Sequence, residues 1–307
     1  VEADRTGKED SYREIFRVLF LIVTPIIFSS FIYNINGYIN GVMYSEIAGK
    51  QGMSSEMVST LYGEYSVYFL TIINIPLTLA GAAPTSMIPE VSALYAQRRM
   101  KAARKKIDEA TQLSMFISIP AAVGLAVLAY PITRLLFPNT NGTAGTLLII
   151  GAVTILFNTN SNVSNGVLQG IGKANLPMWN AAVALLINVG LLAALLRMTS
   201  LGIYAVLVAT IVYSIVICIL NDISMKKYMH YKNPWGLAYL CPILAAIPMG
   251  VVAWGVYYGL ELVTESNLVS LLFAVALGGM TYLSLYTRIM TSLKRAKKRR
   301  QMEKRRK

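Results

Sequence analysis

Residues 174–196 read ANLPMWNAAVALLINVGLLAALL, a stretch without a single charged side chain. A helix that crosses about 30 Å of hydrocarbon needs roughly 20 mostly apolar residues, and this stretch is long enough. Seven further charge-free runs are of comparable length, at 18–45, 65–89, 110–133, 135–172, 198–221, 233–260 and 266–287. The sequence therefore predicts an all-α polytopic membrane protein with eight transmembrane helices.

The composition agrees with this prediction. The chain has 55% hydrophobic and 14% charged residues, with a mean hydropathy of +0.53. A soluble helical protein would carry charged faces on its helices, and these runs offer none. The strands of a membrane barrel are about ten residues long and alternate in polarity, which these runs do not.

The net charge of +13 is distributed unevenly along the chain. If the eight helices alternate in direction, 25 of the 28 lysines and arginines fall on one side: four up to Arg17, six in 98–106, one at 173, three in 226–232 and eleven from 288 onward. Lys50, Arg134 and Arg197 fall on the other side. The positive-inside rule places the first side, and both termini, in the cytoplasm. The charge thus indicates topology rather than a nucleic-acid partner, and the basic tail is suited to anionic lipids.

The predicted organisation has five parts. A cytoplasmic lead-in covers 1–15, a six-helix lobe 16–221, a cytoplasmic loop 222–234, a terminal helix pair 235–288 and a basic cytoplasmic tail 289–307. The expected spans are 16–41, 63–88, 111–133, 144–169, 177–196, 201–221, 235–259 and 268–288. Within the lobe, segment 90–109 alternates apolar residues with six cations, which predicts an amphipathic helix at the membrane interface.

Two predicted helices carry polar stripes. At 100° per residue, one face of the helix at 144–169 holds Thr154, Asn158, Asn162, Asn165 and Gln169, while Asn160 lies across the helix. One face of the helix at 16–41 holds Ser29, Tyr33, Asn36 and Asn40. Such stripes either hydrogen-bond between helices or line a hydrated cavity for a polar substrate, and both interpretations stay open here. We expect these nine residues to line a substrate cavity.

The sequence offers little for catalysis or metal binding. The two cysteines and the single histidine form no metal or disulfide pattern, and no phosphate loop is present. Glu64 is expected at the outer water interface, and no carboxylate is expected inside the lobe. These observations predict no enzyme and no cofactor, and they disfavour coupling to Na⁺ or H⁺.

Two stretches resemble the multidrug/oligosaccharidyl-lipid/polysaccharide exporter superfamily. PTSMIPEVSALYAQRRMKAARKKI at 84–107 is similar to its proline-containing helix end and basic connector, and GVLQGIGKANLP at 166–177 is similar to its tenth helix and the turn that follows. The stretch from Asn188 to Val216 continues the match through the eleventh and twelfth helices. Within the superfamily, the chain most resembles the polysaccharide branch, of the stage V sporulation protein B-like and lipid II flippase type.

The resemblance implies a bacterial cytoplasmic-membrane flippase for an undecaprenyl-linked oligosaccharide or peptidoglycan precursor. On this register the chain matches helices seven to fourteen, so a missing N-terminal lobe is expected as a partner. Some relatives place a cation site among helices seven, eleven and twelve; here Asn40 and Asn188 stand nearest, with no carboxylate beside them. The alternatives are a cation-coupled multidrug exporter and a self-contained eight-helix membrane scaffold.

Overall fold

The computed structural model describes residues 11–138 and 142–306, apart from a few side chains, including that of Tyr33. The described secondary structure is helical. In chain order the elements are α1 (Tyr12–Lys50), α2 (Ser55–Gly63), the π-helical turn η1 (Glu64–Phe69), α3 (Leu70–Ala96), α4 (Met100–Val127), α5 (Ala129–Leu136), α6 (Thr143–Gly151), α7 (Thr154–Gly170), α8 (Asn175–Met198), α9 (Ile203–Met229), the π-helical turn η2 (Trp235–Leu240), α10 (Cys241–Thr264) and α11 (Asn267–Arg306).

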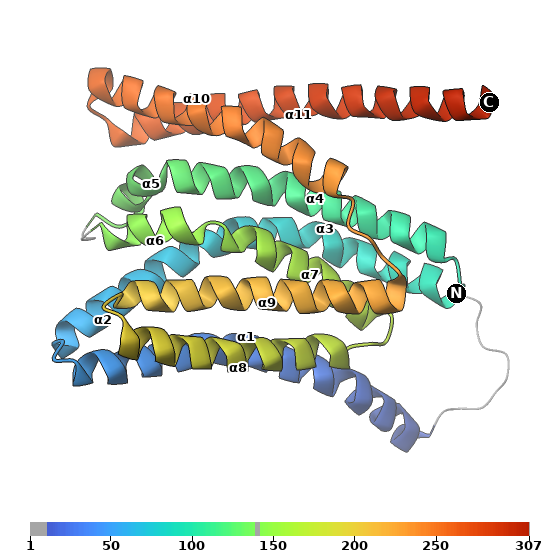
Figure 1. Cartoon of the computed structure of the whole chain (residues 1–307), viewed down its shortest axis with the longest axis horizontal. Coiled ribbons are helices and arrows are strands. Elements are labelled where there is room, and N and C mark those ends of the chain that lie inside the picture. Colours follow the sequence, from blue (N-terminus) through green and yellow to red (C-terminus); the bar gives the residue numbers. More distant parts are fainter. Residues whose placement is uncertain (1–10, 139–141, 307) are drawn as a thin grey trace.

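The helices pack side by side in an order that differs from their order in the chain. From one edge of the bundle to the other, the neighbours run α1, α8, α9, α7, α3, α4, α10 and α11 (Figure 1). Helix α7 is therefore central, between α9 and α3, while α10 and α11 form an outer pair on α4. The start of α1 and the end of α11 lie at the same end of the bundle, called here the basic end.

The structure bears out the predicted membrane spans. Among the described residues, seven helical segments are long and apolar enough to cross a membrane, and α6 and α7, which meet at a bend of 50°, pass the same test together, which gives up to eight spans. The helix predicted at 144–169 is thus broken at 152–153. Thr154 Oγ1 bonds back to Gly151 O at 2.7 Å, and a Cβ at Gly151 would lie 2.3 Å from the Phe69 ring of η1, so the bend packs tightly on the π-helical turn.

The prediction of an interfacial helix at 90–109 is wrong. The segment contains the end of α3, a turn at 97–99 with Arg98 at φ 58°, and the start of α4. Its apolar residues Ala103 and Ile107 are buried in a cluster with Leu168 and Met229 instead of facing lipid. The apolar periodicity therefore reflects packing between helices, a contact that the same pattern permits.

The predicted loop at 222–234 is also shorter than expected. Helix α9 continues to Met229, because Met225 and Met229 pack into the same buried cluster, and only 230–234, called the connector, join it to η2. The predicted tail at 289–307 continues α11 as helix up to Arg306. Most of the predicted lead-in, 1–10, lies outside the described residues.

Candidate substrate cavity

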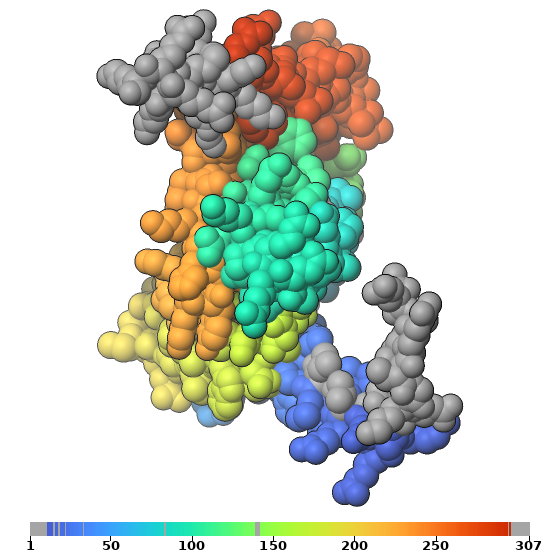
Figure 2. All heavy atoms as spheres, turned by 90° about the vertical axis from the view of Figure 1, so that its right-hand side faces the viewer, coloured from blue at the N-terminus to red at the C-terminus, as the bar shows by residue number. Residues whose placement is uncertain are grey.

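A cavity of about 1030 Å³ lies between α1, α3 and α7, toward the basic end. At the basic end, α1 splays away from the rest of the bundle, and Figure 2 shows its first turns (blue) set apart from α3 and α4 (cyan and teal). The cavity is lined by Ser29, Ser30, Asn34, Leu77, Thr78, Gly81, Ala82, Pro84, Thr85, Ser86, Ile88, Asn162, Asn165, Gly166 and Gln169.

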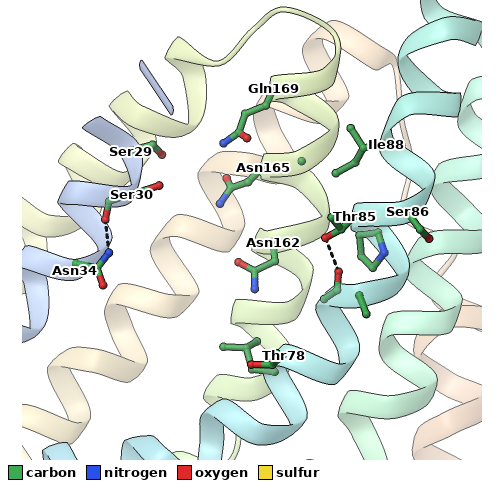
Figure 3. A pocket seen from close by; sticks show the side chains of 15 residues that line it. Ser29, Ser30, Asn34, Thr78, Thr85, Ser86, Ile88, Asn162, Asn165 and Gln169 are labelled. Atoms are coloured by element: carbon green, nitrogen blue, oxygen red, sulfur yellow. Dashed lines mark hydrogen bonds between the residues drawn. The ribbon is translucent and has the colours of Figure 1, made fainter. Parts of the chain in front are cut away.

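Helix α7 supplies three amides in a row. Asn162, Asn165 and Gln169 are spaced three and four residues apart, so they share one face and point into the cavity (Figure 3). Asn165 is held in place, because its Oδ1 accepts a hydrogen bond from Asn221 Nδ2 of α9 at 2.8 Å. Asn221 Oδ1 in turn accepts from Asn180 Nδ2 of α8 at 2.8 Å, so three helices fix the wall.

Helix α1 supplies the facing side of the cavity. Ser29 is buried, and its hydroxyl lacks a hydrogen-bond partner among the described residues. A buried hydroxyl without a partner costs free energy unless water or a ligand satisfies it. Asn34 Nδ2 donates to Ser30 O at 2.7 Å, and its carbonyl faces the open space (Figure 3).

Helix α3 supplies the third side, which the sequence interpretation missed. Thr78 and Thr85 donate to Asn74 O and Gly81 O of their own helix, both at 2.8 Å, which leaves their oxygens able to accept. The helix approaches α7 closely, because a Cβ at Gly166 would lie 2.2 Å from Ile88. Thr78, Gly81 and Thr85 are spaced so that they share one face of the helix, which could have indicated a polar surface. Single hydroxyls in a proline-containing span are, however, also common in helices that line no cavity.

Not all of the nine predicted residues line this cavity. Ser29, Asn162, Asn165 and Gln169 do. Thr154 is buried at the bend, and Asn158 lies outside the lining. The Tyr33 side chain falls outside the described residues.

Asn36 and Asn40 serve a different contact. Their Oδ1 atoms accept from the same Asn188 Nδ2 of α8, at 2.9 and 2.7 Å, and all three side chains are buried. The prediction that they line the cavity is wrong, because the neighbour of this face of α1 changes along the helix. The part near Ser29 faces the cavity, and the part with Asn36 and Asn40 packs on α8. This is the interhelical hydrogen bonding that the sequence left open as the alternative.

The three asparagines do not fit a cation site in this arrangement. A sodium ion needs several oxygen ligands, and here the two α1 carbonyls both face the Asn188 amide nitrogen. Within the described part of the chain, no group of three histidine, cysteine or acidic side chains could hold a metal ion.

The cavity itself is electrically neutral, since its lining contains no charged side chain. One carboxylate is nevertheless buried inside the predicted lobe, contrary to the prediction, and a second lies just beyond the predicted end of the lobe. Glu64 is 3% exposed, and its Oε2 accepts from Ala144 N at 2.8 Å, at the start of α6. Asp222 is half-buried on α9. The sequence placed Glu64 at the water interface because the packing of α6 on η1 could not be foreseen.

Comparisons with known proteins agree with this architecture. The MatE family model matches residues 25–194, more than half of the chain. The lipid II flippase MurJ of Bacillus subtilis (strain 168) is 24% identical over 89% of this chain and 52% of its own length. Stage V sporulation protein B of the same organism is 19% identical over 79% of this chain and 48% of its own length. The chain thus spans about half the length of these curated relatives.

A solved structure shares the fold. Lipid II flippase MurJ in an inward closed conformation superposes with a TM-score of 0.67 at 18% sequence identity, covering 93% of this chain and 57% of that one. The apolar spans and the bacterial transporter relatives identify a multi-pass protein of a bacterial plasma membrane. The match over more than half of its length shows that the chain belongs to the MatE family.

Proposed function

We propose that this bundle is one lobe of a flippase that moves a lipid-linked saccharide or peptidoglycan precursor across the membrane by alternating access. The observation that carries the proposal is the row of Asn162, Asn165 and Gln169 facing α1 and α3 across an uncharged cavity. Relatives named as a lipid II flippase and as stage V sporulation protein B support the substrate class.

The chemistry of the wall selects the part of the substrate that it contacts. Amides and hydroxyls donate and accept hydrogen bonds without charge, as sugar hydroxyls and acetamido groups require. A pyrophosphate is bound best by arginine and lysine, which are absent from this lining. We assign the saccharide to this lobe and the pyrophosphate to a second lobe that closes the cavity and acts as its partner.

The remaining roles belong to the same proposal. The protein acts as a transporter rather than an enzyme, without a cofactor or a nucleic-acid partner. The basic end faces the cytoplasm, where its cations and the basic tail contact anionic lipid head groups. Coupling to Na⁺ at Asn36, Asn40 and Asn188 is disfavoured by their hydrogen bonds to one another.

The test is the substitution Asn162→Leu, with Asn158→Leu as the matched control. Asn162 lines the cavity, whereas Asn158 lies one turn earlier on the same helix, outside the lining. The rate of flipping is measured in proteoliposomes that contain the intact transporter and a fluorescent lipid-linked saccharide. A membrane-impermeant quencher reports the fraction of this lipid in the outer leaflet, and the decrease of that fraction with time gives the rate.

We expect Asn162→Leu to slow flipping roughly tenfold, since one hydrogen bond to a desolvated ligand is worth about 1–2 kcal/mol. Asn158→Leu should leave the rate within about twofold. Membrane insertion and the thermal midpoint of both variants should match those of the unsubstituted protein. Equal rates for the two variants would argue against the cavity as the substrate site.

A further inference from the structure

Asp222 lies near the basic end of α9 and accepts hydrogen bonds on both of its oxygens. Asn160 Nδ2 of α7 donates to Oδ1 at 3.0 Å, and Asn233 Nδ2 of the connector donates to Oδ2 at 3.0 Å. Among the described residues, Asp222 forms no salt bridge. The carboxylate is thus held by amides alone.

The same contacts extend to the terminal helix pair. The Tyr239 hydroxyl of η2 donates to Asn160 Oδ1 at 2.8 Å, which turns the amide nitrogen of Asn160 toward Asp222. That nitrogen also lies 3.2 Å from Cys218 Sγ on α9. Four elements, α7, α9, the connector and η2, therefore meet at one carboxylate.

This arrangement is suited to an ionised carboxylate. An ionised carboxylate only accepts hydrogen bonds, and each oxygen here faces an N–H donor. A protonated acid carries a hydroxyl on one oxygen. The hydrogen of that hydroxyl would then point at the N–H donor that the oxygen faces, and the hydrogen bond from that donor would be lost. Protonation also removes the charge that makes the remaining bond strong.

We propose that Asp222 is a proton-binding site that holds the connector and η2 against the lobe when it is ionised and releases them when it is protonated. Helices α10 and α11 stay attached in both states, because Met115 and Ile119 of α4 pack with Ala245, Met249 and Tyr282 in a separate apolar cluster. The site needs no transport substrate and so stands or falls independently of the proposed flippase activity.

Other titratable and charged groups face this region. Cys218 lies on α9, Tyr239 on η2, and His230, Tyr231 and Lys232 in the connector. From α4, Arg104 Nε donates to Met229 O at 2.8 Å, and Asp108 interacts with Tyr231. Burial raises the pKa of Tyr231 well above its usual value, so its hydroxyl stays neutral at ordinary pH. His230 of the connector is the residue for which the experiments need a control.

The first experiment uses Cys218 as a reporter. Its side chain is buried beside Asn160, and Cys241 is the only other cysteine, so Cys241→Ala leaves a single thiol. Asp222→Asn mimics the protonated acid, because an amide likewise presents a donor on one side. Maleimide labelling of Cys218 in the purified chain is compared at one fixed pH, with Asp108→Asn as the matched control.

We expect Asp222→Asn to speed labelling of Cys218 roughly tenfold. The loss of one charge-assisted hydrogen bond makes opening of the packed site about that much more frequent. Asp108→Asn should leave the rate near that of the parent. An unchanged rate in Asp222→Asn, or equal acceleration in both variants, would overturn the proposal.

A second experiment keeps Asp222 in place. Trp235 begins η2, and its ring centroid lies 4.8 Å from that of Tyr239, so its fluorescence reports on the position of η2. With Trp179 and Trp254 changed to Phe, the emission of Trp235 is followed between about pH 5 and pH 8. We expect a single reversible transition that survives His230→Asn. A flat profile, or a transition lost in His230→Asn, would contradict the proposal.

Discussion

Asn188 joins α8 to α1 through a single amide nitrogen. That nitrogen donates to both Asn36 and Asn40, and the Asn188 side chain is fully buried. In Asn188→Leu two buried carbonyl oxygens lose their donor, which should destabilise the protein by about 1–3 kcal/mol. The measurement is the thermal unfolding midpoint of the purified protein. Asn34→Leu is the control, since exposed Asn34 bonds only within α1, and an equal decrease in both variants would contradict the assignment.

The same three asparagines give a prediction about sodium. Both α1 carbonyls accept from the Asn188 nitrogen, so the only oxygen of these three side chains that is left without a partner in the described part of the chain is the Asn188 carbonyl, and a cation needs several oxygens. A ligand that binds the folded state raises its stability. The thermal midpoint should therefore be the same in sodium chloride and in choline chloride at equal ionic strength. A clear increase in sodium that Asn188→Leu abolishes would show a cation site here.

At this scale each predicted stripe lines the cavity only in part. Asn162, Asn165 and Gln169 share one face of α7 and line the cavity, whereas Thr154 and Asn158 of the same stripe lie outside its lining. Asn36 and Asn40 share a face with Ser29 but contact a different helix. Periodicity defines the faces of a helix, whereas the neighbour on each face is decided by tertiary packing.

At the scale of elements, the break between α6 and α7 depends on Gly151. A Cβ there would lie 2.3 Å from Phe69 and 2.9 Å from Leu207, which is too close for any ordinary contact. Gly151→Ala should therefore lower the thermal midpoint, at a cost of about 1–3 kcal/mol from overpacking. Gly190→Ala in α8 is the matched control, because no atom lies within 4 Å of its added Cβ. It should leave the midpoint unchanged or raise it slightly. Equal effects would contradict the packing described here.

The elements also show which signals the sequence lacks. Charge-free runs gave the number and order of the spans, because the cost of burying charge in lipid limits where charges occur. The bend at 152–153 falls within one such run and is marked by no proline. Segment 90–109 has an apolar face that suits lipid or protein equally, and only the position of α9 shows that it packs on protein.

At the scale of the whole molecule, the distribution of cations predicts the orientation of the bundle. The turn at 97–99, Lys173 and the connector all lie at the basic end with the start of α1, whereas Lys50, Arg134 and Arg197 lie at the other. Positive loops stay in the cytoplasm during insertion. Alkaline phosphatase, which is active only outside the cytoplasm, should therefore be active when inserted at Gly52 and inactive when inserted at Lys232.

The two insertion sites are matched, since Gly52 and Lys232 are both exposed residues in short connections between helices of the described chain. A fluorescent protein that matures only in the cytoplasm should give the opposite pattern at the same sites. Activity of the phosphatase at Lys232 would show that the basic end faces the outside, opposite to the predicted orientation. The cavity, which lies toward the basic end, would then open toward the outer face, and the proposed cycle would have to begin with the substrate bound from outside.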